Sequence, residues 1–134
     1  MGATDGQANT VLVIEDQNEV RRALARMLKV EGFDVLEARD GSEAVHLYAA
    51  HAARIVAATL DLMMPTTNGR ETLAMLSEFA PRLPIVVSTA LPLPDNLIGR
   101  VPGSRGVGYL QKPYTAKQLS DELRRVIAEE SAGG

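Results

Sequence analysis

Residues 11–16 read VLVIED, four consecutive apolar residues followed by two acidic ones. An apolar run without a polar break is typical of a parallel strand that is buried on both faces of its sheet. In open parallel sheets, ligands bind beyond the carboxyl ends of the strands. The stretch therefore predicts a strand over 11–14 and places Glu15 and Asp16 where a ligand would bind.

Four further apolar runs follow along the chain, at residues 33–36, 55–60, 85–87 and 107–110. Helix-like segments separate most of them, and alternation of strands with helices predicts a parallel sheet joined by crossover helices. The first helix is expected to end at a left-handed Gly32, and the second to cover 42–50. A third should begin near Asn68, and a last one should begin at the capping box of Thr115 and Gln118.

The stretch between the fourth and fifth runs differs from the others, because Pro92, Pro94, Gly99, Pro102 and Gly103 crowd the place where a fourth crossover helix belongs. Proline blocks helix continuation and glycine raises the entropic cost of order. We therefore expect the fourth helix to be short or disordered. The domain should cover residues 10–130, with disordered segments at 1–9 and 131–134.

Composition excludes several classes of protein. The 134 residues contain no cysteine, which removes zinc-ribbon and thiol chemistry and fits a reducing, cytoplasmic compartment. Residues 1–9 do not resemble a signal peptide, and no run is long enough to span a membrane. A net charge of -3 with no long basic run argues against nucleic acid as a partner.

Polar residues also follow the later strands at their carboxyl ends. Asp61 follows the third, Ser88 and Thr89 the fourth, and Lys112 the fifth. Clustered carboxylates need a compensating cation, and Mg²⁺ prefers oxygen ligands while leaving positions for phosphate. This pattern predicts phosphoryl transfer to Asp61 as nucleophile, with Mg²⁺ held by the acidic pair 15–16. Lys112 and Thr89 would then contact phosphoryl oxygens.

The chain resembles the receiver domains of bacterial two-component response regulators over residues 10–128. The resemblance rests on VIED at 13–16, DLMMP at 61–65 with Asn68-Gly69, STA at 88–90 and YLQKPY at 109–114. It implies a flavodoxin-like three-layer α/β sandwich with five parallel strands in the order 2-1-3-4-5. The last motif is closest in wording to receivers of hybrid histidine kinases.

The resemblance also implies a role for each site residue. Asp61 accepts a phosphoryl group from a histidine kinase or a histidine phosphotransfer protein, and Thr89 and Tyr109 act as the switch. The Mg²⁺ ligands are Glu15, Asp16, Asp61 and the Met63 backbone carbonyl, and the Lys112-Pro113 peptide bond is cis. The chain would be a monomer or weak dimer that controls an unknown output protein. It would have no enzyme activity beyond self-phosphorylation and self-dephosphorylation.

Three alternatives remain open from the sequence. The chain could be a pseudo-receiver that binds partners without phosphate, or a receiver excised from a hybrid kinase. A flavin or nucleotide binder of similar fold is a third, although residues 15–18 contain no glycine to admit a phosphate. Met63 and Leu91 flank the site with apolar side chains that cannot orient water, so we expect slow self-dephosphorylation.

Overall fold

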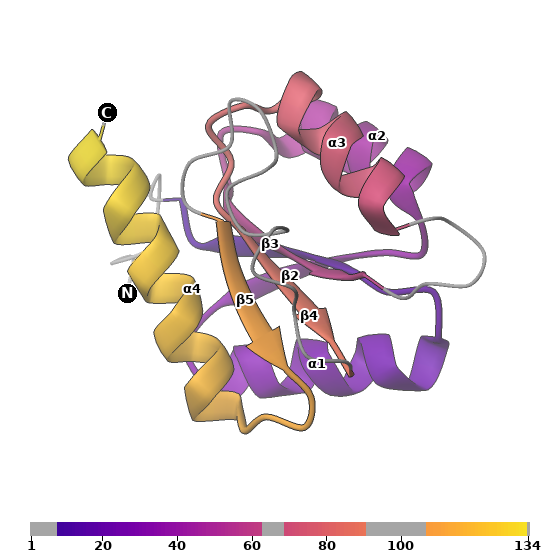
Figure 1. The fold of residues 1–134 in the computed structure, drawn as a ribbon, viewed down its shortest axis with the longest axis vertical. Helices are drawn as coiled ribbons and strands as arrows, with labels where there is room; N and C mark the ends of the chain where they lie inside the picture. The colour runs from indigo at the N-terminus through magenta and orange to yellow at the C-terminus, as the bar shows by residue number, and fades with distance from the viewer. Residues whose placement is uncertain (1–7, 63–68, 91–106, 134) are drawn as a thin grey trace.

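The computed structural model describes residues 8–62, 69–90 and 107–133. Its sheet is parallel throughout and has the order β2-β1-β3-β4-β5, which confirms the expected architecture (Figure 1). The strands are β1 (Thr10–Ile14), β2 (Asp34–Ala38), β3 (Ile55–Asp61), β4 (Ile85–Thr89) and β5 (Val107–Gln111). The described helices are α1 (Asn18–Val30), α2 (Gly41–His51), α3 (Gly69–Phe79) and α4 (Ala116–Gly133).

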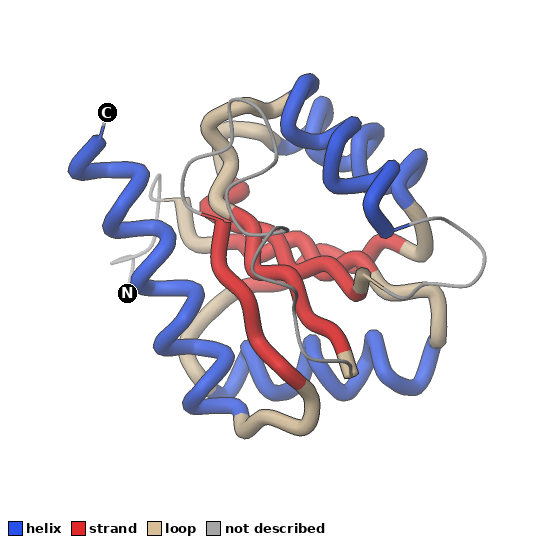
Figure 2. Tube along the Cα trace, in the orientation of Figure 1, coloured by secondary structure: helices blue, strands red, loops and turns tan. Residues whose placement is uncertain are grey.

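The helices cover both faces of the sheet, as Figure 2 shows. Because successive side chains of a strand point to opposite faces, β1 contributes to two cores. Val11 and Val13 pack in the cluster that includes Leu residues of α1 and α4. Leu12 and Ile14 pack in the cluster that includes Leu73 and Leu76 of α3 and Ala44 of α2. Burial of β1 on both sides explains its unbroken apolar sequence.

Local hydrogen bonds set the helix boundaries. The Thr115 capping box is confirmed: Gln118 N donates to Thr115 Oγ1 at 3.0 Å, and Thr115 N donates to Gln118 Oε1 at 2.8 Å. At the start of α2, Glu43 N donates to Asp40 Oδ1 at 2.8 Å. Gly32, which follows α1, has a φ of 97°, a conformation that favours glycine. The expected left-handed end of the first helix is therefore confirmed.

The carboxyl-terminal end of the chain differs from expectation. We expected the domain to end at residue 130, with 131–134 disordered, but α4 continues to Gly133. Ser131 and Ala132 are compatible with a helix, and no proline interrupts it, so the helix continues to Gly133. The fourth crossover helix expected between residues 91 and 106 lies outside the described residues, as does Asn68. None of the described helices combines the length and apolar character needed to cross a membrane.

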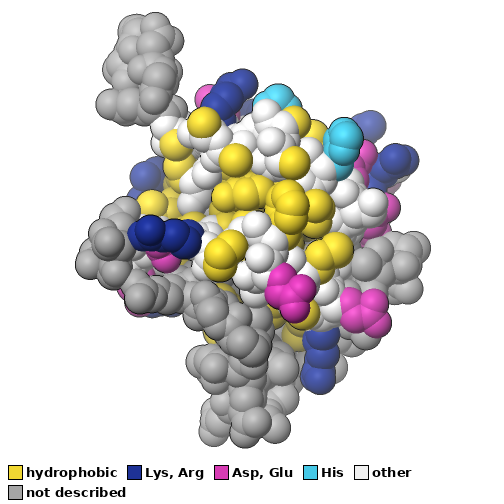
Figure 3. Space-filling model, turned by 90° about the horizontal axis from the view of Figure 1, so that it is seen from above, with side chains coloured by type: hydrophobic (Ala, Val, Ile, Leu, Met, Phe, Trp, Pro, Cys, Tyr) yellow, Lys and Arg dark blue, Asp and Glu magenta, His cyan; other side chains and the backbone are white. Residues whose placement is uncertain are grey.

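An apolar patch lies on the outer surface of α2 and α3. Figure 3 views this face, where apolar side chains gather beside the two histidines of the chain. The rings of Tyr48 and Phe79 meet edge to face with centroids 6.0 Å apart. Met75 and Phe79 remain 39% and 48% exposed. This face therefore exposes large apolar side chains to solvent.

Candidate functional site

The carboxyl ends of four strands bring the predicted site residues to one edge of the sheet. Asp61 ends β3 and pairs in register with Ser88 of β4. Thr89 ends β4 and pairs with Gln111, directly before Lys112. Glu15 and Asp16 follow β1 at the same edge. Met63 lies outside the described residues, so its carbonyl stays a prediction.

An ion pair joins the two chemically central side chains. Lys112 Nζ lies 2.9 Å from Asp61 Oδ2, and the two side chains are 31% and 13% exposed. Burial lowers the pKa of Lys112, but the hydrogen bond to Asp61 and the nearby carboxylates of Asp61 and Glu15 raise it by more. Lys112 therefore stays cationic beside the predicted nucleophile. The Lys112-Pro113 peptide bond is cis, as the resemblance implies.

Glu15 is a buried carboxyl group in an acidic neighbourhood. It is 1% exposed, and burial raises its pKa to about 7. The Gln17 backbone N–H, 3.0 Å from Glu15 Oε2, lowers the pKa, but the neighbouring Asp61 and Asp16 raise it further. Glu15 Oε1 is also buried, with no hydrogen-bond partner in the described part of the chain. A cation placed beside this group would relieve both the repulsion and the unsatisfied oxygen.

The donor set at this edge consists of carboxylate oxygens, the type of ligand that Mg²⁺ prefers. Among residues 8–62, 69–90 and 107–133, no three or more His, Asp or Glu side chains are grouped as a metal site. Mg²⁺ commonly uses one or two carboxylates and fills its other positions with water and phosphate oxygens. Glu15 and Asp16, which follow β1, are carboxylate donors of this kind.

Hydroxyl groups lie near the same strand ends. Thr89 is 2% exposed, and its carbonyl accepts a hydrogen bond from Lys112 N at 2.8 Å. Tyr109 is half-buried, and its side chain packs beside the core that lies under α2 and α3. Its backbone N–H donates to Glu122 Oε2 at 3.3 Å. Thr89 therefore contacts the backbone of Lys112, and Tyr109 lies two residues before the end of β5.

Tyr114 is a site neighbour that the sequence did not single out. Burial raises the pKa of its phenol, while a hydrogen bond with Ser88 and the charge of Lys112 lower it. The charges of Asp61 and Glu15 also act on this hydroxyl and raise its pKa. Its position directly after Lys112-Pro113 is a signal in the sequence that could have identified it.

The first residue of α3, Gly69, cannot carry a side chain for steric reasons. A Cβ on Gly69 would overlap the carbonyl oxygen of Leu62, the residue after Asp61. Backbone atoms cannot move aside as a flexible side chain can, so only glycine allows this approach. Gly69 therefore holds the start of α3 close to the backbone that carries Asp61.

An apolar groove borders the site between α1 and the segment 112–114. Val20, Ala23, Leu24 and Met27 line it from α1, together with Lys112, Pro113 and Tyr114. Since Lys112 also contacts Asp61, a partner seated in this groove would lie next to the predicted nucleophile.

Comparisons with known proteins find relatives over most of the chain. The model of the response regulator receiver domain family matches residues 11–124. The response regulator MprA of Mycolicibacterium vanbaalenii is 36% identical over 129 residues, which cover 92% of this chain and 54% of that protein. The chain spans about half the length of the curated relatives it matches.

Solved structures share the fold. A receiver domain protein from Clostridium thermocellum superimposes with a TM-score of 0.81 at 24% identity, over 94% of this chain and 99% of that one. A chain of the CheX–CheY–BeF3–Mg²⁺ complex from Borrelia burgdorferi gives a TM-score of 0.76 at 26% identity, over 88% of each chain.

Proposed function

Because the chain belongs to the response regulator receiver domain family, we propose that Asp61 accepts a phosphoryl group from a histidine kinase or a histidine phosphotransfer protein in the cytoplasm. The observation that supports this most directly is the 2.9 Å contact between Asp61 Oδ2 and Lys112 Nζ beside the buried Glu15. A carboxylate, a cation and a partial metal site are the parts that phosphoryl transfer to aspartate requires.

Each residue has a distinct task in this proposal. A carboxylate oxygen of Asp61 bonds to phosphorus while the bond from phosphorus to the donor nitrogen breaks, and the donor histidine keeps that electron pair. Lys112 neutralises a phosphoryl oxygen, and the Thr89 hydroxyl donates a hydrogen bond to another. Glu15, Asp16, Asp61 and the Met63 carbonyl would hold Mg²⁺. When bound, the ion supplies charge neutralisation for the phosphoryl oxygens.

Phosphorylated Asp61 would act as a signal to other proteins. A phosphoryl group adds about -1.5 to -2 charge and three acceptor oxygens at the site. Lys112 and Thr89 would turn toward it, and Tyr109 would respond as the second switch residue, shifting a conformational equilibrium that an output protein reads. The chain would have no enzyme activity beyond self-phosphorylation and self-dephosphorylation.

We further propose that the phosphodonor docks in the groove along α1. The groove is lined mainly by apolar side chains of α1 and borders Lys112, which contacts Asp61. An amphipathic helix of the donor that packs its apolar face there would bring its histidine to the edge of the sheet.

Incubation with Mg²⁺ and acetyl phosphate tests the proposal. Intact mass should show one added phosphoryl group on the native chain and none on Asp61→Asn. Asp121→Asn is a matched control, because this aspartate is 62% exposed on α4 and should not affect uptake. A native chain that gains no mass would support a pseudo-receiver instead, and equal gains in the native and Asp61→Asn chains would show that Asp61 is not the acceptor. Titration with flavin and nucleotide tests the alternative of a flavin or nucleotide binder.

A further inference from the structure

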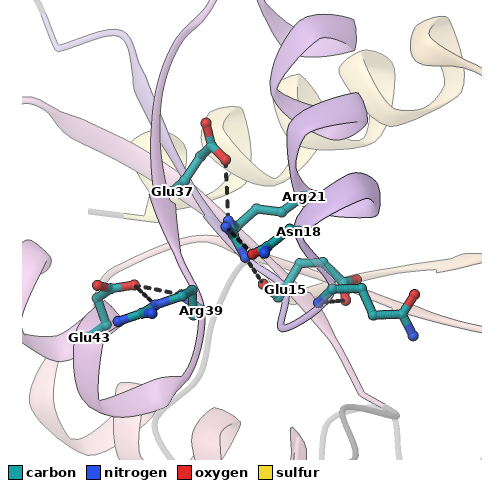
Figure 4. A network of polar contacts seen from close by, with 7 residues as sticks. Glu15, Asn18, Arg21, Glu37, Arg39 and Glu43 are labelled. Carbon is teal, nitrogen blue, oxygen red and sulfur yellow. Dashed lines mark hydrogen bonds and ion pairs between the residues drawn. The ribbon is translucent and has the colours of Figure 1, made fainter.

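A buried arginine holds together the segment that joins β1 to α1. Arg21 lies on α1, and its side chain is 9% exposed. Its guanidinium donates to the Glu15 carbonyl at 3.0 Å, to Asn18 Oδ1 at 2.7 Å and to Glu37 Oε1 at 3.2 Å (Figure 4). Three acceptors from three places in the chain thus meet one planar cation.

Of the three acceptors, the Glu15 carbonyl is the one nearest the proposed phosphorylation site. Its carbonyl belongs to the peptide bond that joins Glu15 to Asp16, and this unit is planar. By holding the carbonyl oxygen, Arg21 restricts rotation of the plane from which both acidic residues extend. The Glu15 N–H on the other side of the residue donates to Ala38 O of β2 at 3.0 Å. The backbone of the acidic pair is therefore restrained on both sides.

Arg21 is also paired with a side chain of β2. Glu37, directly before Ala38, forms the ion pair with Arg21, and its side chain is 36% exposed. Arginine suits such a position because its planar fork donates in several fixed directions, whereas the lysine ammonium is a compact point charge. A buried guanidinium that lost its partners would be costly, so the arrangement is strongly preferred over alternatives.

We propose that Arg21 is a positioning residue for Mg²⁺: it fixes the peptide between Glu15 and Asp16 so that the two carboxylates face the metal together. This rests on the proposed function, since it assumes that the acidic pair holds the ion. Residues that orient metal ligands typically affect metal affinity about 10- to 100-fold when they are replaced. Arg21 contacts neither the phosphoryl group nor the metal in this proposal.

Arg124 provides a matched control within the chain. Like Arg21, it donates to a backbone carbonyl just outside α1, in this case Glu31 O at 2.8 Å beyond the other end of the helix. Its guanidinium also lies 4.6 Å from the centre of the Phe33 ring. Arg124 therefore anchors α1 in a similar way but far from the acidic pair. If Mg²⁺ binding weakens only because α1 is less well anchored, it should weaken in the Arg21 and Arg124 variants alike. If it weakens because the acidic pair is displaced, it should weaken in the Arg21 variant alone.

The test measures Mg²⁺ affinity by titration of backbone amide resonances in the native, Arg21→Met and Arg124→Met chains. The same spectra show whether each chain is folded. We expect Arg21→Met to weaken Mg²⁺ binding about tenfold, and Arg124→Met to remain within about twofold of native. Phosphorylation by acetyl phosphate should need about tenfold more Mg²⁺ in Arg21→Met, with a rate at saturating Mg²⁺ within about twofold of native.

The other possible results also decide whether the proposed role of Arg21 stands. A folded Arg21→Met chain that binds Mg²⁺ within about twofold of native overturns the role of Arg21, even when native phosphorylation is normal. If Arg21→Met does not fold, Arg21→Lys is compared with Arg124→Lys. Equal Mg²⁺ affinities of these two variants overturn the proposed role of Arg21. A native chain that binds no Mg²⁺ overturns the proposed function and this inference together.

Discussion

Replacing Glu15 with glutamine should stabilise the metal-free chain at neutral pH. Glu15 is 1% exposed, and burial raises its pKa from 4.5 to about 7. In the folded chain the carboxyl group therefore holds its proton at pH values where the unfolded chain has released it. The contribution of the Glu15 carboxyl group to the free energy of unfolding is fully present below about pH 4.5, and it is lost as the pH rises through about 7.

The size of the effect follows from the same two values. One pKa unit corresponds to about 1.4 kcal/mol, so a shift from 4.5 to about 7 corresponds to about 3 kcal/mol at full burial. Glutamine is neutral at every pH, and its amide oxygen can still accept the hydrogen bond from Gln17 N. Glu15→Gln should therefore gain up to about 3 kcal/mol over native at pH 8 and little at pH 4.5.

Urea unfolding in EDTA at several pH values between 4.5 and 8 would measure this difference. Glu19→Gln is the control, because that glutamate is exposed on α1 and should change stability little. Added Mg²⁺ should stabilise the native chain more than Glu15→Gln, because the variant has lost a charged ligand. A Glu15→Gln chain that is no more stable than native at pH 8, or whose advantage does not shrink toward pH 4.5, would refute the reasoning.

Three further predictions concern the surroundings of the site. Met63→Asn should speed loss of the acyl phosphate about tenfold by orienting water, as followed by intact mass, and equal rates would contradict the expectation of slow self-dephosphorylation. Gly69→Ala should lower the free energy of unfolding in urea by about 1–3 kcal/mol, since its Cβ would overlap the carbonyl oxygen of Leu62; an unchanged urea midpoint would show that the backbone shifts to accommodate the methyl group. Ala23→Glu should slow phosphorylation by a donor protein but not by acetyl phosphate, with exposed Ala49→Glu on α2 as control. Equal slowing with both phosphodonors would argue against docking on α1.

Much of the fold could be predicted from local patterns. The VLVI run predicted a doubly buried strand, and both core clusters use it as expected. Capping by Thr115 and Gln118 and the left-handed Gly32 depend on residues within a few positions of one another, so the sequence contains the whole interaction. The expectation that residues 131–133 are disordered was wrong, because no strong stop signal follows residue 130 and the helix continues to Gly133.

The position of the candidate residues at the strand ends could be predicted from the sequence, but their burial and pKa values could not. Order along the chain placed Glu15, Asp16, Asp61, Thr89 and Lys112 at strand ends, because parallel strands end at a common edge. The 1% exposure of Glu15 and its raised pKa depend on what packs around it in three dimensions. No local pattern contains that information.

The sequence by itself determined which residues could meet, and the tertiary structure decided which atoms do. Lys112 and Asp61 are 51 residues apart, and Arg21 and Glu37 are 16 apart. Parallel register across β3, β4 and β5 sets the first contact, and the packing of α1 beside β2 sets the second. Both are long-range properties of the folded chain, and this is why Arg21 was recognised only in the structure.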